Sequence, residues 1–339
     1  MAEKSKYIRQ SWVILTIFLI AGLNPVFGQK KVGTTIFQFL KVMPDAHGTG
    51  MGDAVTSTIN NANAAFYNPA GLTGVEKLDF TFSFYNYFFD VKTTSMSLAY
   101  KMGLYGTLGF HFIHTDIGRI AVTSVDQLGF GEDGTYNPGL TGETINPSQM
   151  VIGLSYARSL TEKFSFGINS KYAREDMIKA DADGIVFDFG LIYKTGYRSI
   201  QISSVIRNFG PEISFSDDEI ATNNSDFESY PPPQTLAIGV SGFLIAPENS
   251  LLFLSSNQRL RVAFDIIGPR DYDQQYNTGL EWGYQDLLFI RTGYKFNYDT
   301  QGISFGFGFR TNNFRGDYSY ASYGKYLSKI HRISVGMEF

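Results

Sequence analysis

From residue 78 to its end, the chain places apolar side chains at every second position over many short stretches. The stretch ISFGFGFR at residues 303–310 is typical, because aliphatic and aromatic residues occupy one parity while Ser, Gly and Arg occupy the other. Successive side chains of a β-strand point to opposite faces of its sheet. Each stretch therefore predicts a strand with one apolar face and one polar or small-residue face.

The alternation predicts fourteen strands of about ten residues, the length with which a tilted strand crosses a membrane. They are expected at residues 78–88, 93–101, 104–115, 149–158, 162–174, 184–194, 198–208, 234–244, 258–267, 277–285, 287–297, 302–310, 313–323 and 330–339. A further apolar patch at residues 120–125 is interpreted as a loop or as an extension of the third strand.

The connections between these strands alternate in length. If the first strand runs outward, the two longest connections, 116–148 and 209–233, both lie on the external side, and most of the shortest lie on the periplasmic side. Only the connection 245–257 does not fit, because it is long but falls on the periplasmic side. Short periplasmic turns and long external loops are typical of bacterial outer-membrane barrels.

A soluble β-sandwich or propeller is the alternative, since such folds also use alternating strands. They bury their apolar face against another sheet, whereas a single closed sheet turns that face toward lipid. Closure is required in lipid, which offers no hydrogen-bond partner to an open sheet edge. Together with the export signal described next, the pattern predicts an all-β fold, a fourteen-stranded antiparallel transmembrane β-barrel over residues 78–339.

The N-terminus has the layout of a secretory signal peptide. Lys4, Lys6 and Arg9 precede an apolar stretch at residues 12–21, and cleavage is expected between Gly28 and Gln29. A membrane anchor is the alternative, although the apolar stretch is short for a span. We therefore expect a signal peptide at 1–28 and a mature chain located in the outer membrane, in contact with its lipid.

Composition narrows the classes of function. The chain has 30 Phe, 21 Tyr and 35 Gly but no Cys, which excludes disulfides, Cys-based zinc sites and thiol catalysis. The net charge of −4 carries no nucleic-acid signature. The four His residues lack metal-ligand spacing, and a barrel lipase or protease is disfavoured. We predict a non-enzymatic protein with no catalytic residues, metal or cofactor.

Charged residues are expected on the inward face of the barrel. They are Lys171, Asp188, Arg207, Arg259, Arg261, Asp265, Glu281, Arg291, Lys295, Arg310, Arg332 and Glu338. Enclosed charges must be paired to be tolerated, so they predict a structural ladder of salt bridges; a substrate path is the alternative. The chain ends in Phe339 in register with outward apolar residues, which is typical of the signal that the outer-membrane barrel assembly machinery reads.

Three stretches before the first strand carry a resemblance to a known family: FQFLKV at 37–42, GTGMGDA at 48–54 and AFYNPAGL at 65–72. They resemble the N-terminus of the PorV/PorQ family, which belongs to the FadL-like outer-membrane barrels. The matching motif comprises Gly48, Gly50, Met51, Gly52, Asn68, Pro69, Ala70, Gly71 and Leu72. A nucleotide loop is the other interpretation of the glycines, but the required strand–turn–helix setting is absent.

The resemblance implies that residues 29–77 fold into the lumen as a hatch. It also implies a non-enzymatic role in the type IX secretion of Bacteroidota, in which such proteins bind C-terminal signal domains of secreted cargo and accompany translocon subunits. Cargo would dock on 116–148 and 209–233. The alternative function is a FadL-like diffusion channel for hydrophobic small molecules, with an apolar pocket bounded by the hatch, Ile113 and Val205.

Overall fold

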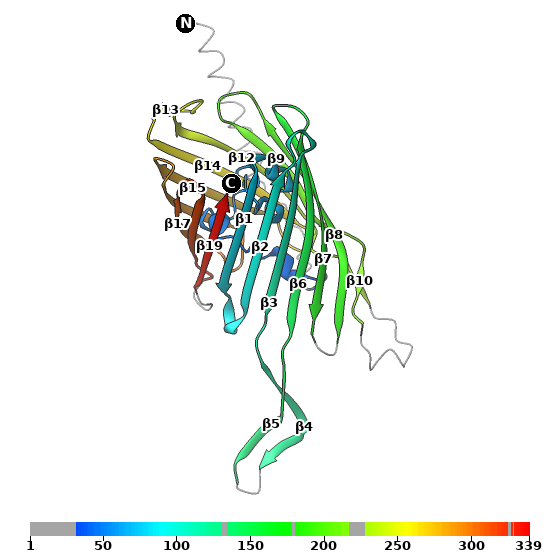
Figure 1. Ribbon diagram of the computed structural model, residues 1–339. Helices are drawn as coiled ribbons and strands as arrows, with labels where there is room; N and C mark the ends of the chain where they lie inside the picture. Colours follow the sequence, from blue (N-terminus) through cyan, green and yellow to red (C-terminus); the bar gives the residue numbers. More distant parts are fainter. Residues whose placement is uncertain (1–31, 131–133, 178–179, 217–227, 325–326, 328) are drawn as a thin grey trace.

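The computed structural model describes residues 32–339, except 131–133, 178–179, 217–227, 325–326 and 328. Within these residues, fourteen antiparallel strands close into one barrel (Figure 1), since β19 pairs with β1 and β9 pairs with β12. The barrel strands are β1 (Leu78–Asn86), β2 (Lys92–Lys101), β3 (Thr107–Asp116), β6 (Ser148–Ser159), β7 (Phe164–Asp176), β8 (Asp181–Lys194), β9 (Gln201–Phe209), β12 (Thr235–Ala246), β14 (Gln258–Pro269), β15 (Gln275–Tyr284), β16 (Leu288–Phe296), β17 (Ile303–Arg310), β18 (Phe314–Ala321) and β19 (Ile330–Glu338). The predicted fold class is confirmed, and each of the predicted strands overlaps one of these.

The apolar patch at 120–125 is neither a loop nor an extension of the third strand. It begins β4 (Ile120–Phe130), which pairs with β5 (Tyr136–Ile145) in a separate two-stranded sheet that projects from the barrel (Figure 1). The chain leaves the barrel sheet after Asp116, where Gly118 adopts a positive φ of 88°. Alternation alone predicts a strand but does not say which sheet the strand joins, so the interpretation was wrong.

Connections of different length lie at opposite ends of the barrel. We call the end that carries connections 117–147 and 210–234 the loop mouth, and the end that carries turns 102–106, 160–163 and 311–313 the short-turn mouth. At the loop mouth, β10 (Ile213–Ser214) pairs with β11 (Ser229–Tyr230). At the short-turn mouth, β13 (Phe253–Leu254) runs parallel to the end of β12. The long connection 245–257 thus contains a short strand that pairs with the end of β12 at this mouth.

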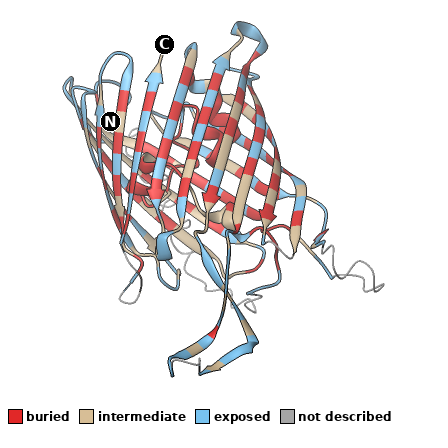
Figure 2. Ribbon diagram, turned by 60° about the horizontal axis from the view of Figure 1, so that its bottom comes forward, coloured by how far each residue is buried: buried red, intermediate tan, exposed pale blue. Residues whose placement is uncertain are grey.

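The apolar face of the barrel looks outward. On β1, Phe80, Phe82 and Phe84 are exposed, while Thr81 and Ser83 between them are buried. The same banding recurs from strand to strand (Figure 2). No second sheet covers these aromatic residues in the described part of the chain. The sandwich alternative is therefore wrong, and the exposed band is the surface that a lipid-embedded barrel requires.

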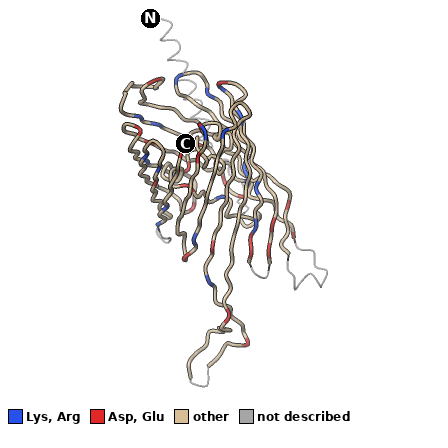
Figure 3. Tube along the Cα trace, in the orientation of Figure 1, with Lys and Arg blue, Asp and Glu red and all other residues tan. Residues whose placement is uncertain are grey.

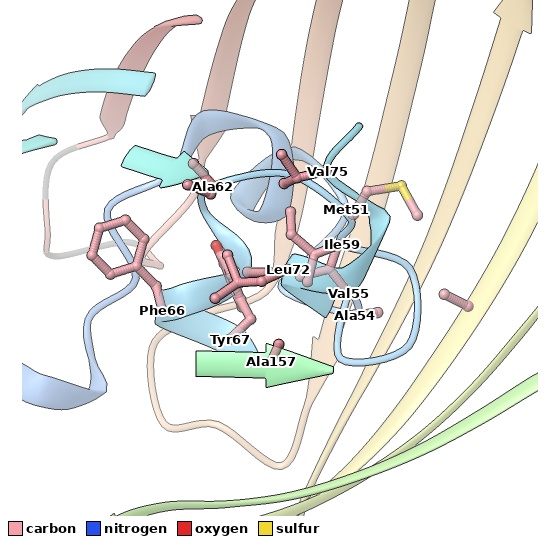
Figure 4. Packing of buried hydrophobic residues seen from close by; sticks show 13 residues of the cluster. Met51, Ala54, Val55, Ile59, Ala62, Phe66, Tyr67, Leu72, Val75 and Ala157 are labelled. Atoms are coloured by element: carbon pink, nitrogen blue, oxygen red, sulfur yellow. The ribbon is translucent and has the colours of Figure 1, made fainter. Parts of the chain in front are cut away.

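Residues 32–77, which we call the hatch, lie inside the barrel. The hatch contains η1 (Gln38–Lys41), α2 (Ala46–Gly50), α3 (Ala64–Tyr67) and η2 (Pro69–Gly74). Outside the hatch, η3 (Phe88–Asp90) and η4 (Gly103–Tyr105) lie in turns between barrel strands. Met51, Val55, Ile59, Phe66 and Leu72 form a buried apolar core within the lumen (Figure 4). No helix in the described part of the chain is long and apolar enough to cross a membrane. The predicted signal peptide, with Gly28 and Gln29, lies outside the described residues.

Candidate functional site

The first half of the hatch motif touches the barrel backbone directly. A Cβ on Gly293 of β16 would lie 2.1 Å from the backbone nitrogen of Gly52, and one on Gly279 of β15 would lie 2.4 Å from the carbonyl oxygen of Met51. Atoms of a real side chain do not approach so closely. Inward glycines on this wall therefore create the space in which the Gly50–Gly52 turn rests.

The second half of the motif docks on the opposite wall. A Cβ on Gly167 of β7 would lie 2.3 Å from the Pro69 carbonyl carbon, and one on Gly190 of β8 would lie 2.0 Å from the side-chain oxygen of Asn68. That oxygen also accepts a hydrogen bond from the Ala70 N–H at 3.1 Å, which caps η2. Pro69 suits the first helical position because its missing N–H would have no partner there.

The remaining motif residues pack within the hatch itself. A Cβ on Gly48 would lie 2.2 Å from the Tyr67 hydroxyl oxygen, and one on Gly71 would lie 2.3 Å from the Ile59 carbonyl oxygen. Leu72 is completely buried in the hatch core. The motif is thus a set of backbone contacts and small-residue positions, and not a nucleotide loop.

Replacing Gly293 by alanine is expected to lower the free energy of unfolding by about 1–3 kcal/mol, the usual cost of inserting atoms into a packed site. The new methyl group must displace Gly52 or the strand that carries Gly293. Urea-induced unfolding in detergent micelles, followed by tryptophan fluorescence, measures the change. Gly268→Ala is the control, because the nearest atom to its new Cβ is 3.9 Å away. Equal stabilities of the two variants would contradict hatch docking at Gly293.

Charged wall residues also hold the hatch in place. Asp265 of β14 accepts hydrogen bonds from the Thr56 backbone N–H at 3.0 Å and from the Thr56 hydroxyl at 2.6 Å. Lys295 of β16 forms a partly buried ion pair with Asp53 of the hatch. These bonds satisfy polar groups that would otherwise be stranded in an enclosed lumen. The predicted lumen charges Asp265 and Lys295 therefore serve the hatch.

Sequence reasoning missed Asp79, Arg315 and Asp317. Asp79 accepts a hydrogen bond from the Ala62 N–H at 3.0 Å and pairs with Arg315 at 2.9 Å. Asp317 pairs with Arg291 at 2.6 Å. All three lie at the inward parity of strands whose opposite parity is exposed. The same alternation that identified the other lumen charges was the signal that could have found them.

Most of the predicted lumen charges form ion pairs. The short pairs are Lys171–Asp188 at 2.7 Å, Arg291–Glu281 at 2.7 Å, Arg310–Glu338 at 2.6 Å and Arg259–Asp286 at 2.8 Å. Acidic and basic residues are interspersed along the strands and do not gather in one patch (Figure 3). Since these charges already have opposite partners, the arrangement favours a structural ladder over a substrate path.

Arg207 and Arg332 have different surroundings. The Arg207 guanidinium lies 3.8 Å from the Met43 sulfur of the hatch, and the Arg332 guanidinium lies 4.4 Å from the centre of the Tyr85 ring. No carboxylate of the described residues forms an ion pair with either. Phe339 is exposed, and its backbone exchanges hydrogen bonds with Leu78 at the seam between β19 and β1. Its role as an assembly signal stays a prediction.

The hatch is clamped to the loop mouth near its N-terminus. Asp271, in the turn after β14, accepts hydrogen bonds from Thr35 at 2.9 Å, Gln38 at 2.8 Å and Lys41 at 2.6 Å. Burial alone would raise the pKa of Asp271, but the hydrogen bonds from Lys41, Gln38 and Thr35 lower the pKa below its ordinary value. The Asp271 carboxylate therefore keeps its negative charge at neutral pH.

Separate cavities lie on the two sides of the hatch. The loop-mouth cavity has a volume of about 170 Å³ and is bounded by Leu40 and Met43 of the hatch and by Ile267 and Asn277 of the wall. The short-turn cavity has a volume of about 130 Å³ and contacts His47 of the hatch. The two share no lining residue, so the hatch separates them.

The sequence predicted one apolar pocket near Ile113 and Val205, but these two residues do not line a common pocket. Ile113 lines a small cavity of about 20 Å³ together with Phe66, Leu40 and Met43. Val205 does not line that cavity. It packs against Ala237 and Ile267 instead, and Ile267 lines the loop-mouth cavity.

The chain was compared with known proteins. No family model and no curated protein matches it. Among solved structures, it resembles the CymD monoaromatic hydrocarbon channel, with 14% identity, a TM-score of 0.57 and coverage of 87% of this chain and 97% of that one. It also resembles the Pseudomonas putida toluene transporter TodX, with 11% identity, a TM-score of 0.56 and coverage of 86% and 97%.

A third structure is a Pseudomonas aeruginosa FadL homologue, with 11% identity, a TM-score of 0.47 and coverage of 92% of this chain and 100% of that one. The barrel shares the fold of the CymD and TodX barrels. At these identities the likeness concerns the fold alone, and it does not single out the PorV/PorQ family.

Proposed function

We propose that the protein is an outer-membrane channel for small hydrophobic molecules, kept closed by its hatch. The observation that carries this proposal is the loop-mouth cavity between hatch and wall, to which Leu40, Met43 and Ile267 contribute apolar side chains. The rest of its lining is mainly polar and includes the charged residues Asp53, Arg207 and Lys295. A small apolar ligand would rest on the apolar side chains, while polar groups of the lining would fix its orientation. The likeness to a hydrocarbon channel and a toluene transporter supports the proposal.

Cavity size suggests the size of the ligand. The loop-mouth cavity of about 170 Å³ is close to the roughly 150 Å³ of a dry engineered cavity that binds benzene. A molecule with one aromatic ring would fit between the hatch and the wall. Further passage would require the hatch to shift, since the cavities on its two sides share no lining residue.

The proposed location is the outer membrane, reached by export and cleavage after Gly28. The exposed aromatic band supports a lipid environment. With the first strand running outward, the loop mouth would face the exterior and the short-turn mouth the periplasm. Phe339 would be read there by the barrel assembly machinery.

Filling the loop-mouth cavity tests the channel proposal. Met43→Trp is expected to weaken binding of toluene to the purified protein at least tenfold, because the indole occupies the space beside Ile267. Depletion of toluene from the headspace above protein in detergent measures binding, with empty micelles as the blank. Met177→Trp is the matched control, since Met177 is exposed and lines none of the cavities described above. Failure of the unaltered protein to bind toluene saturably would rule the proposal out.

A second candidate is a component of type IX secretion of the PorV/PorQ kind, as in Bacteroidota. The β4–β5 hairpin, which projects from the barrel (Figure 1), favours it. Val125, Leu128 and Phe130 of β4 are exposed, and an isolated two-stranded hairpin is marginally stable without a partner. Translocon subunits and C-terminal signal domains of cargo would be its partners. Replacing 120–145 by a short Gly-Ser linker should then leave cargo unattached, and normal surface display of cargo would exclude this role.

A further inference from the structure

The short-turn cavity contains two inward phenylalanine rings. Phe243 of β12 and Phe289 of β16 both line it. Phe289 lies at the same parity of β16 as the buried Arg291. Arg259 and Asp286, which are 42% and 50% exposed, stand at its entrance. The cavity therefore combines two phenylalanine rings with a mainly charged lining, and it is reached from the short-turn mouth.

The other arginines that line this cavity each form an ion pair shorter than 3 Å, whereas Arg261 does not. Its closest carboxylate oxygen, Oε1 of Glu281, is 3.6 Å away. The other oxygen of Glu281 already contacts Arg291 at 2.7 Å and His47 at 3.2 Å. Within the described residues, no side chain or carbonyl group accepts a hydrogen bond from Arg261. Its remaining N–H groups are available to a ligand.

The position of Arg261 is nevertheless defined. Its guanidinium carbon lies 4.4 Å from the centre of the Phe243 ring, a cation–π contact that holds the plane against the aromatic face. A guanidinium fixed in this way presents a fork of donors that matches the two oxygens of a carboxylate. Because Arg261 is already oriented, little side-chain freedom is lost when a carboxylate binds.

We propose that the short-turn cavity is a binding site for a small aromatic carboxylate. The carboxylate accepts hydrogen bonds from the Arg261 fork, and the ring lies against Phe243 and Phe289. The volume of about 130 Å³ is near the roughly 150 Å³ in which a benzene ring is held. This site lies on the opposite side of the hatch from the loop-mouth cavity and does not depend on the proposed channel activity.

The lining of the cavity favours an anion that also carries a ring. Five arginines and the three acids Glu281, Asp286 and Asp317 line the cavity, and inorganic phosphate would leave the rings of Phe243 and Phe289 without a partner. A neutral hydrocarbon of the same shape would leave the Arg261 fork without an acceptor. The site should therefore select benzoate over both inorganic phosphate and toluene.

Calorimetric titration of the purified full chain in a neutral detergent tests the site. Benzoate is the probe, and toluene, acetate and inorganic phosphate are the comparison ligands. Arg261→Gln is expected to weaken benzoate binding at least tenfold, and Arg261→Lys, which keeps the charge but loses the fork, is expected to weaken it less. Arg174→Gln is the matched control, because Arg174 is similarly charged, 42% exposed and paired with Asp181 at the loop mouth.

Each possible result of this titration either supports or overturns the proposed site. Saturable benzoate binding that falls in Arg261→Gln but not in Arg174→Gln or Met43→Trp supports the site. Binding of toluene or inorganic phosphate as tightly as benzoate overturns the assignment of the ligand class. Unchanged benzoate binding in Arg261→Gln, or no saturable binding by the unaltered chain, overturns the site. Since Met43→Trp reports on the other cavity, failure of the channel proposal is recognised independently.

Discussion

Arg291→Leu is expected to lower the free energy of unfolding by about 3–5 kcal/mol, the range found when one partner of a buried ion pair is removed. Arg291 is 4% exposed and contacts Glu281 at 2.7 Å and Asp317 at 2.6 Å. Its removal leaves two carboxylates in an enclosed lumen without their nearest positive charge. Urea-induced unfolding in detergent micelles measures the change.

Arg310→Leu is the matched control, because Arg310 also pairs with an acid, Glu338, but its side chain is 41% exposed. An exposed pair is worth at most about 1 kcal/mol. Replacing Glu281 and Asp317 by their amides together with Arg291→Leu should recover part of the lost stability. Equal effects of the two arginine substitutions, or no recovery in the triple variant, would show that the lumen charges do not act as a ladder.

Phe307→Arg is expected to lower the free energy of unfolding in lipid vesicles by about 2–4 kcal/mol, the cost of an arginine on the lipid face of a barrel near the bilayer midplane. Phe307 lies in the middle of β17, is 49% exposed and has an outward side chain. The guanidinium would replace an aromatic ring in hydrocarbon. Unfolding by urea from vesicles of defined lipid composition measures the change.

The control for Phe307→Arg is Leu104→Arg in the turn η4, where the side chain is 91% exposed. A charge near the membrane interface costs only about 0–1 kcal/mol. A large effect at Leu104 together with a small effect at Phe307 would place the bilayer away from the aromatic band. It would also contradict the transmembrane interpretation of the outward face.

The strands could be predicted because the alternation of apolar and polar residues is a local property of the sequence. Which side chains face inward follows from the same parity, and Arg315 and Asp317 were within reach of that argument. Parity does not say which inward charges meet. Glu281 and Arg291 lie opposite each other on adjacent strands, whereas Asp317 reaches Arg291 from a strand further along the sheet.

The hatch illustrates the same limit. Its Gly-rich and Asn-Pro-Ala-Gly-Leu stretches were recognisable as unusual, but their partners are inward glycines such as Gly293, more than two hundred residues away in the chain. The patch at 120–125 was visible as apolar, but its place in a projecting hairpin depends on pairing with β5. Local composition carries no information about such distant contacts.

The sequence by itself determined the positions of the barrel strands, their outward apolar face and the sign of their inward charges, because each depends only on alternation along a strand. Tertiary structure alone decided that backbone meets backbone at Gly52 and Gly293, and that cavities lie on both sides of the hatch. It also decided that Arg261 is left without a short contact while Arg291 has two. Those outcomes depend on the closure of the barrel around the hatch, which brings distant residues within contact distance.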